Sequence, residues 1–280
     1  NQPDESQKQI PQREANPYVE AFWKWFPEAV THMHTFRITG GEPLMSKHTN
    51  RVIEHLVQNP QPTLECAVHT NASPPGETQW KEFVDKIKIL EDNNCIKRFV
   101  LFVSAESKGA QAEYNRYGMD WTMFTDNVKY YLKHTNSSCV FMSAFNVLSI
   151  PTFLPFLKYV SRLKSGYEND IKIDIPYVRS PGFLDAKIAS DALIKEYLHP
   201  CIPYMEEKNF NNREKAQMKR IVKDLDLRHA NLDNWKQEAI EGRRMFYEWI
   251  QQYDKRRNVN FLEVFPQMKD FYKECKKCMI

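Results

Sequence analysis

Residues 36–44 read Phe36-Arg37-Ile38-Thr39-Gly40-Gly41-Glu42-Pro43-Leu44, and this stretch decides how the rest of the chain is interpreted. A short run with β-branched residues leads directly into two glycines, an acid and a proline. Glycines after a strand let the backbone adopt φ values closed to other residues, and let a ligand approach the main chain closely. The stretch therefore predicts a strand ending in a tight turn, with Glu42 presented at the strand's carboxyl end, where α/β folds bind their ligands.

Strand and helix patterns alternate along the chain on both sides of this turn. Short apolar runs predict strands at residues 35–39, 64–70, 98–104, 138–146 and 171–178. Amphipathic spacing predicts helices at residues 16–31, 46–58, 79–90, 121–132 and 152–163, the first of them bent near Pro27. The run 99–103 has no polar residue, which is typical of a strand covered on both faces. This alternation favours parallel strands with helical crossovers, and so an α/β fold.

The chain divides into three parts by composition. Residues 1–15 are polar and predict a flexible lead-in. Residues 16–182 hold the strand–helix alternation, and residues 183–280 predict a helical C-terminal extension that packs against it. Within that extension we expect a helix over 186–197, broken by Pro200 and Pro203.

The overall charge excludes some classes of partner. The 280 residues carry 39 Lys and Arg against 36 Asp and Glu, a net charge of +3, so no dominant field exists for nucleic acid or an anionic membrane. Residues 205–280 are mildly basic. No apolar run approaches the length of a membrane span, and the first residues form no signal peptide. We expect a cytoplasmic protein with neither a nucleic-acid nor a membrane partner.

Cysteines and histidines offer weaker candidates. Cys275 and Cys278 are either two of the ligands of a zinc ion or an auxiliary cluster, or an exposed dithiol, and two ligands alone complete no site. Histidines gather around the opening turn without a carboxylate spacing that would complete a metal site, so solvated side chains are the simpler interpretation. His69 lies near the expected pocket and is a candidate for substrate contact. No metal ligand is predicted within the chain.

Gly40-Gly41-Glu42-Pro43 at a strand end, inside a series of βα units, resembles the S-adenosylmethionine (SAM) binding turn of radical SAM proteins. The resemblance extends in order along residues 16–280. Its further matches are Thr70-Asn71-Ala72, Val103-Ser104-Ala105-Glu106, the arginine-containing loop Tyr114-Asn115-Arg116-Tyr117-Gly118, Asn146 and Ile173-Asp174-Ile175-Pro176. Trp235, Phe246, Asp254, Arg256 and Phe265-Pro266 resemble the tail of the group with a twitch extension. The resemblance implies a partial (β/α)₆ TIM-like barrel whose first strand is missing.

The resemblance also implies a cofactor site. In the family a 4Fe-4S cluster passes an electron to SAM, giving a 5′-deoxyadenosyl radical that takes hydrogen from the substrate. The implied SAM-binding residues are Gly40, Gly41, Glu42, Pro43, Asn71, Ser104, Glu106 and Asn146. The carbonyls of the two glycines and the Glu42 carboxylate would hold the SAM ammonium. Ser104 and Glu106 would face the ribose or the methionine carboxylate, Asn146 would bond a ribose hydroxyl, and Asn71 would lie on the same rim.

One departure from the family is large. The Cys-x₃-Cys-x₂-Cys motif that holds the cluster does not occur in the sequence. The simplest expectation is a chain that begins downstream of the cluster loop, in which case the full-length enzyme acts with an electron donor on a peptide or other large molecule. The alternative is a non-catalytic, cluster-free binding module. In either case we predict that these 280 residues bind no SAM-coordinating cluster.

Overall fold

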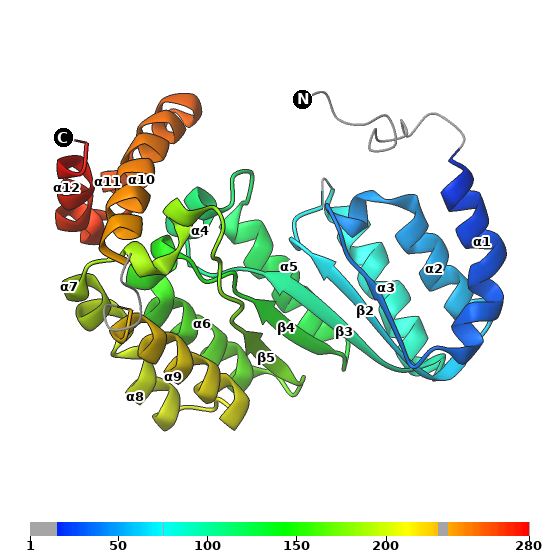
Figure 1. The fold of residues 1–280 in the computed structure, drawn as a ribbon. Helices are drawn as coiled ribbons and strands as arrows, with labels where there is room; N and C mark the ends of the chain where they lie inside the picture. The colour runs from blue at the N-terminus through cyan, green and yellow to red at the C-terminus, as the bar shows by residue number, and fades with distance from the viewer. Residues whose placement is uncertain (1–15, 75, 229–234, 280) are drawn as a thin grey trace.

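The computed structural model describes residues 16–74, 76–228 and 235–279, so the predicted lead-in at 1–15 lies outside the described residues. A five-stranded, all-parallel sheet forms the centre of the fold, in the order β1-β2-β3-β4-β5 (Figure 1). The strands are β1 Thr35–Ile38, β2 Gln61–Thr70, β3 Ile96–Ser104, β4 Ser138–Met142 and β5 Ile171–Asp174. The α/β prediction is confirmed. The sheet is open, because the order ends at β1 on one side and at β5 on the other.

One face of the sheet carries a layer of helices, in which α2, α3, α5 and α6 follow one another across Figure 1. The helices before β5 are α1 Pro17–Ala29, α2 Lys47–Gln58, α3 Glu77–Asp92, α4 Ala110–Asn115, α5 Trp121–His134 and α6 Phe153–Gly166, with 3-10 turns η2 Val30–His32, η3 Pro43–Met45 and η4 Val147–Thr152. Trp80, Phe83 and Ile87 of α3 recur at helical spacing and are all fully buried. The expected helices are thus present, and Pro27 lies within α1.

The opposite face of the sheet is only partly covered. Burial alternates along β3, where Val100 and Phe102 are half-buried between fully buried neighbours, so the prediction that residues 99–103 are covered on both faces is wrong. Residues 99–103 are nevertheless all apolar, because the side chains on the buried face and those on the half-buried face of β3 both pack against neighbouring residues. On this face the His69 ring stacks on Phe102 with centroids 4.2 Å apart, and the Arg37 guanidinium lies 5.6 Å from the Phe102 ring centroid. Burial, and secondarily Arg37, lower the pKa of His69.

The two edges of the sheet differ. β1 lies at one edge and, among the described residues, pairs only with β2. At the other edge, side chains of α9 (Asn212–Asp226) occupy the free backbone groups of β5 and the residues after it. Glu214 accepts from the Ile173 amide at 2.9 Å, and Gln217 accepts from the Ile175 amide at 3.3 Å. Covering an edge in this way prevents pairing with a further strand.

The last two strands are shorter than their sequence patterns predicted. β4 ends at Met142 and β5 at Asp174, although residues 143–146 and 175–178 continue side by side with single contacts such as the Phe145–Tyr177 bridge. Ser143 turns its hydroxyl to the Ala105 carbonyl at 2.7 Å, which fixes the chain where it leaves the sheet.

Residues after β5 are helical. They form η5 Gly182–Leu184, η6 Ala186–Ile188, α7 Asp191–Leu193, the π-helical η7 Ile194–Leu198, α8 Cys201–Glu207, α9, α10 Trp235–Arg257, α11 Phe261–Val264, η8 Pro266–Met268 and α12 Lys269–Lys277. The predicted break at Pro203 is wrong, because Pro203 lies in the first turn of α8. Backbone amides in the first turn have no intrahelical acceptor, so proline's missing N–H removes no helical hydrogen bond there. No described helix is long and apolar enough to cross a membrane.

Candidate functional site

The turn after β1 combines an unusual backbone angle with open space. Gly40 has φ +102°, which L side chains rarely adopt, and, apart from the adjoining residues, no atom of the described chain lies within 4 Å of the place a Cβ would occupy on Gly40 or Gly41. Both glycines are exposed. The turn therefore leaves its main chain accessible from outside, as a ligand-binding turn requires.

The two glycines should respond differently to alanine. Gly40→Ala is expected to lower the free energy of unfolding by about 1–2 kcal/mol, because the strain lies in the backbone and not in any clash. Gly41→Ala is the matched control, and we expect it to change the free energy of unfolding by no more than about 0.5 kcal/mol. Urea denaturation of both variants measures the difference. Equal losses would show that the Gly40 backbone angle is not what the turn depends on.

Glu42 is fixed at the carboxyl end of β1 by three donors. Its Oε1 accepts from the Thr70 hydroxyl at 2.7 Å and from the Leu44 amide at 3.1 Å, and its Oε2 accepts from the Asn71 amide at 2.6 Å. A carboxylate offers about four lone-pair positions, so one acceptor position remains after these three bonds. The side chain is half-buried, which leaves this position within reach of a ligand.

Residues at the end of β2 donate hydrogen bonds to Glu42. The Thr70 hydroxyl that donates to Glu42 also accepts from the Ala72 amide at 3.0 Å, and Ala72 adopts φ 51°. Asn127 of α5 holds this turn by donating to the Ala72 carbonyl at 2.9 Å. The exposed Asn71 side chain is thereby left at the rim, beside the Glu42 carboxylate.

A cavity of about 540 Å³ lies at this edge of the sheet. Three of the predicted site residues line it, and the loop after α4 supplies the facing wall. The lining residues include Glu42, Asn71 and Ser104 from the strand ends, Asn115 from the end of α4, and Arg116 and Tyr117 from the loop after it. The carboxyl ends of three adjacent strands thus contribute to one cavity, with an acid on one side and a cation on the other.

Glu106 lies behind this cavity. Its side chain is 3% exposed and accepts from Arg116 through Nε at 3.0 Å and through a terminal nitrogen at 2.6 Å. Burial raises the pKa of the Glu106 carboxyl, and the Arg116 guanidinium opposes that rise. Glu106 therefore positions Arg116, whose remaining N–H groups can face the cavity.

Removing Arg116 should destabilise the protein in a pH-dependent way. Arg116→Met leaves the Glu106 carboxylate buried without its partner and raises its pKa further above the unfolded value. A raised folded-state pKa makes stability fall as pH increases from the unfolded pKa to the folded one. We expect little loss near about pH 4 and a loss of about 2 kcal/mol near neutrality, since Arg116 is partly exposed.

Urea denaturation across this pH range measures the effect. Adding Glu106→Gln to Arg116→Met should remove this added pH dependence, because position 106 then no longer carries a buried carboxylate. A loss of equal size at every pH would mean that Arg116 stabilises the fold by packing alone.

Two predicted site residues are engaged in local structure. The Asn146 side chain is buried, accepts from the Leu148 amide at 2.9 Å and donates to the Ala144 carbonyl at 3.1 Å, so it caps η4 and does not line the cavity. Pro43 is buried at the start of η3, and its carbonyl accepts from the Thr49 hydroxyl at 2.6 Å. Pro43 thus anchors the turn to α2.

Other cavity residues were not singled out from the sequence. Met45, Ser73 and Met119 line the same space. The Arg257 guanidinium lies 3.3 Å from the centroid of the Tyr117 ring, and this contact connects the cavity loop with α10. No motif marks Met45, Ser73 or Met119, although their closeness to Glu42, Asn71 and Gly118 in sequence is a usable signal, whereas Tyr117 belongs to the arginine-containing loop noted in the sequence.

The cysteines lie apart from this cavity. Cys275 is fully buried, and burial raises its pKa, so it packs as a thiol in the core; Cys278 donates to the Glu274 carbonyl at 3.5 Å. Among the described residues, no three His, Cys, Asp or Glu side chains are grouped so that they could hold a metal ion.

Comparisons of the chain with protein-family models, with curated proteins and with solved structures found no match.

Proposed function

We propose that the cavity beside Glu42 binds SAM, and that the chain is the SAM-binding α/β core of a radical SAM enzyme. The observation that carries the proposal is the Glu42 carboxylate, fixed by three hydrogen bonds at the rim of a cavity of about 540 Å³ with one acceptor position left. An ammonium group is the ligand that such a position favours. The resemblance of the turn to the family's SAM site supports the same assignment.

Residues in and beside the cavity would bind both ends of the methionine moiety of SAM. Glu42 and the open backbone of Gly40 and Gly41 would take the ammonium, and the Arg116 N–H groups not used by Glu106 would take the carboxylate. Ser104 and Asn115 offer a hydroxyl and an amide for the ribose. Together these residues would bind and orient the cofactor.

The described residues do not fit a 4Fe-4S cluster, because none of their groups offers three clustered ligands. We therefore assign no redox step to this chain, and propose that the cluster ligands and the electron donor are supplied from outside it. A partial TIM-like barrel, with the half-covered sheet face lining the space for substrate, is the architecture that goes with this function.

Calorimetric titration of SAM into the 280-residue chain tests the proposal. We expect saturable binding at one site per chain, and no SAM-coordinating cluster after anaerobic treatment with iron and sulfide. Absence of SAM binding would refute the assigned cavity. A stoichiometric cluster that coordinates SAM would refute the assignment of its ligands to a place outside the chain.

A further inference from the structure

A second charged cavity lies beyond the carboxyl end of β5, between residues 177–187 and α9. Its volume is about 430 Å³, and its polar lining consists of Tyr177, Arg179, Lys187, Arg220, Asp224 and Arg228. Four cations therefore line the cavity with one acid. Gathering like charges around one space raises the free energy of the folded protein unless an anion enters it.

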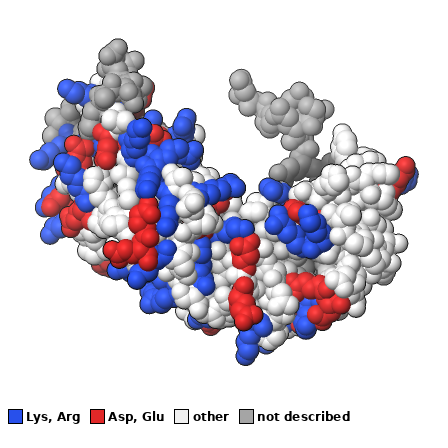
Figure 2. All heavy atoms as spheres, turned by 90° about the horizontal axis from the view of Figure 1, so that it is seen from below, with Lys and Arg blue, Asp and Glu red and all other residues white. Residues whose placement is uncertain are grey.

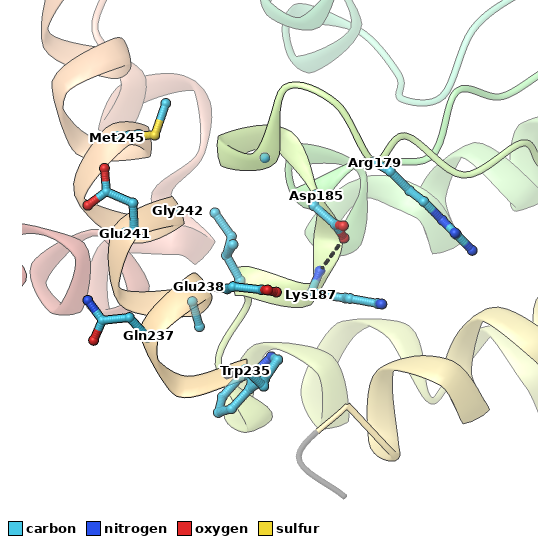
Figure 3. A pocket seen from close by; sticks show the side chains of 12 residues that line it. Arg179, Asp185, Lys187, Trp235, Gln237, Glu238, Glu241, Gly242 and Met245 are labelled. Atoms are coloured by element: carbon cyan, nitrogen blue, oxygen red, sulfur yellow. Dashed lines mark hydrogen bonds between the residues drawn. The ribbon is translucent and has the colours of Figure 1, made fainter. Parts of the chain in front are cut away.

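The outer three cations of this cavity have no direct ion-pair partner among the described residues. Arg179, Lys187 and Arg220 form no salt bridge there, although Arg179 and Lys187 interact electrostatically with Asp185 at longer range. The backbone amide of Lys187 donates to the Asp185 carboxylate at 2.8 Å, and this bond does not use the Lys187 ammonium. Figure 3, which shows the neighbouring cavity of about 580 Å³ against α10, has the side chains of Arg179 and Lys187 extending to the same side, away from α10.

The fourth cation is buried and is held in place by hydrogen bonds. Arg228 is 3% exposed, donates to the Ala189 carbonyl at 3.1 Å, and contacts the Leu225 carbonyl and the Asp191 carboxylate. Its Nε is buried and has no hydrogen-bond acceptor among the residues that the structure describes. A buried donor left without a partner is costly, so an acceptor supplied by a ligand would offset that cost.

Three of the lining residues follow one side of α9 and of the residues directly after it. Arg220 and Asp224 lie one turn apart on α9, and Arg228 follows a turn later, so one face of this segment points at the cavity. Figure 2, which shows the molecule from below, has Lys and Arg interspersed with Asp and Glu over the part that holds the C-terminal helices, while the opposite part is mostly uncharged. The acids near the four cations are Asp224 in the cavity lining, Asp185 in the adjoining cavity, and Asp191, which pairs with Arg228.

We infer that this cavity binds a phosphate group of a ligand. Arginine guanidinium groups match the geometry of phosphate oxygens and bind them bidentately, and the three outer cations come from two separate segments that can surround one tetrahedral anion. The inference does not depend on SAM binding, because its residues share none with the Glu42 cavity.

Titration of the 280-residue chain with inorganic phosphate, and separately with pyrophosphate, tests the inference at constant ionic strength. We expect saturable binding to the wild-type chain, weakened roughly tenfold by Arg220→Gln and also by Arg179→Gln. Both side chains are exposed, so both variants should keep the wild-type circular dichroism spectrum.

Lys223→Gln is the matched control, since it removes the same charge from an exposed position of α9 that does not line the cavity. Its dissociation constant should equal that of the wild type within error. Absence of phosphate and pyrophosphate binding would overturn the inference. A loss in Lys223→Gln as large as that in Arg220→Gln would overturn it too, because it would reveal general charge attraction without a site.

Discussion

Replacing Glu42 by glutamine is expected to weaken SAM binding about 100-fold, which corresponds to about 2.7 kcal/mol. The loss arises because a neutral amide no longer balances the ammonium in a half-buried position, and truncating one side of such a pair costs about 2–5 kcal/mol. Glutamine must also turn its NH₂ toward one of the three donors that now bond the carboxylate, and the Asn71 amide at 2.6 Å is the tightest of them. Calorimetric titration with SAM measures the change.

A ligand that lacks the amino-acid part of SAM distinguishes the loss of the ammonium contact from a change in the shape of the turn. 5′-Methylthioadenosine has no ammonium, so Glu42→Gln should leave its affinity nearly unchanged if the role of Glu42 is to bind that group. Glu82→Gln, at an exposed position of α3, is the matched control for the loss of one negative charge. Equal weakening of SAM and 5′-methylthioadenosine would show that Glu42 holds the turn in shape and does not contact the ammonium.

The sequence predicts the parts of this site that depend on local backbone chemistry. Gly40 marks the turn because its φ of +102° is one that L side chains rarely adopt, and the apolar runs place Asn71 and Ser104 at neighbouring strand ends. The turn follows from local backbone geometry, and the neighbouring strand ends follow from the parallel order of the strands. Consequently three of the residues expected to meet in space do line one cavity.

Competing hydrogen bonds account for two site residues that the sequence placed in the cavity and the structure does not. Asn146 ends a predicted strand, yet its side chain caps η4, because the buried amide of Leu148 needs an acceptor there. Glu106 follows a strand end in the same way, but Arg116 draws it behind the cavity wall. Both partners lie within ten residues in the sequence, and Asn146 with Ser149 forms a capping box, but the predicted strand and the SAM resemblance indicated other roles for these two side chains.

The C-terminal helices illustrate a different limit. The sequence shows them as helical but does not show that α9 lies along the edge of β5, since the contacts of Glu214 and Gln217 with the chain around β5 join segments about 40 residues apart. Nor does it predict the close approach of α10 to η6, where a Cβ on Gly242 would lie 2.6 Å from Ile188 Cγ2. That approach requires glycine for lack of space, not for backbone freedom.

Glu214 connects the sheet to these helices, and Glu214→Gln is expected to lower the free energy of unfolding by about 3–5 kcal/mol. The side chain is 2% exposed, and its two oxygens accept from Lys164 Nζ at 2.7 and 2.8 Å, from the Ile173 amide and from the Asn211 amide. Glutamine removes the charge that balances a nearly buried ammonium and presents an NH₂ group where donors already point. Urea denaturation measures the loss.

A second substitution distinguishes the buried charge from the lost hydrogen bonds. Adding Lys164→Met to Glu214→Gln should recover part of the stability, because the double variant leaves no uncompensated ammonium beside Phe210. Asp92→Asn, which breaks the exposed Lys88–Asp92 pair, is the control and should leave the urea midpoint unchanged. If Lys164→Met restores nothing, the hydrogen bonds from Ile173 and Asn211 account for the whole loss, and Glu214 stabilises the protein chiefly by closing the edge of β5.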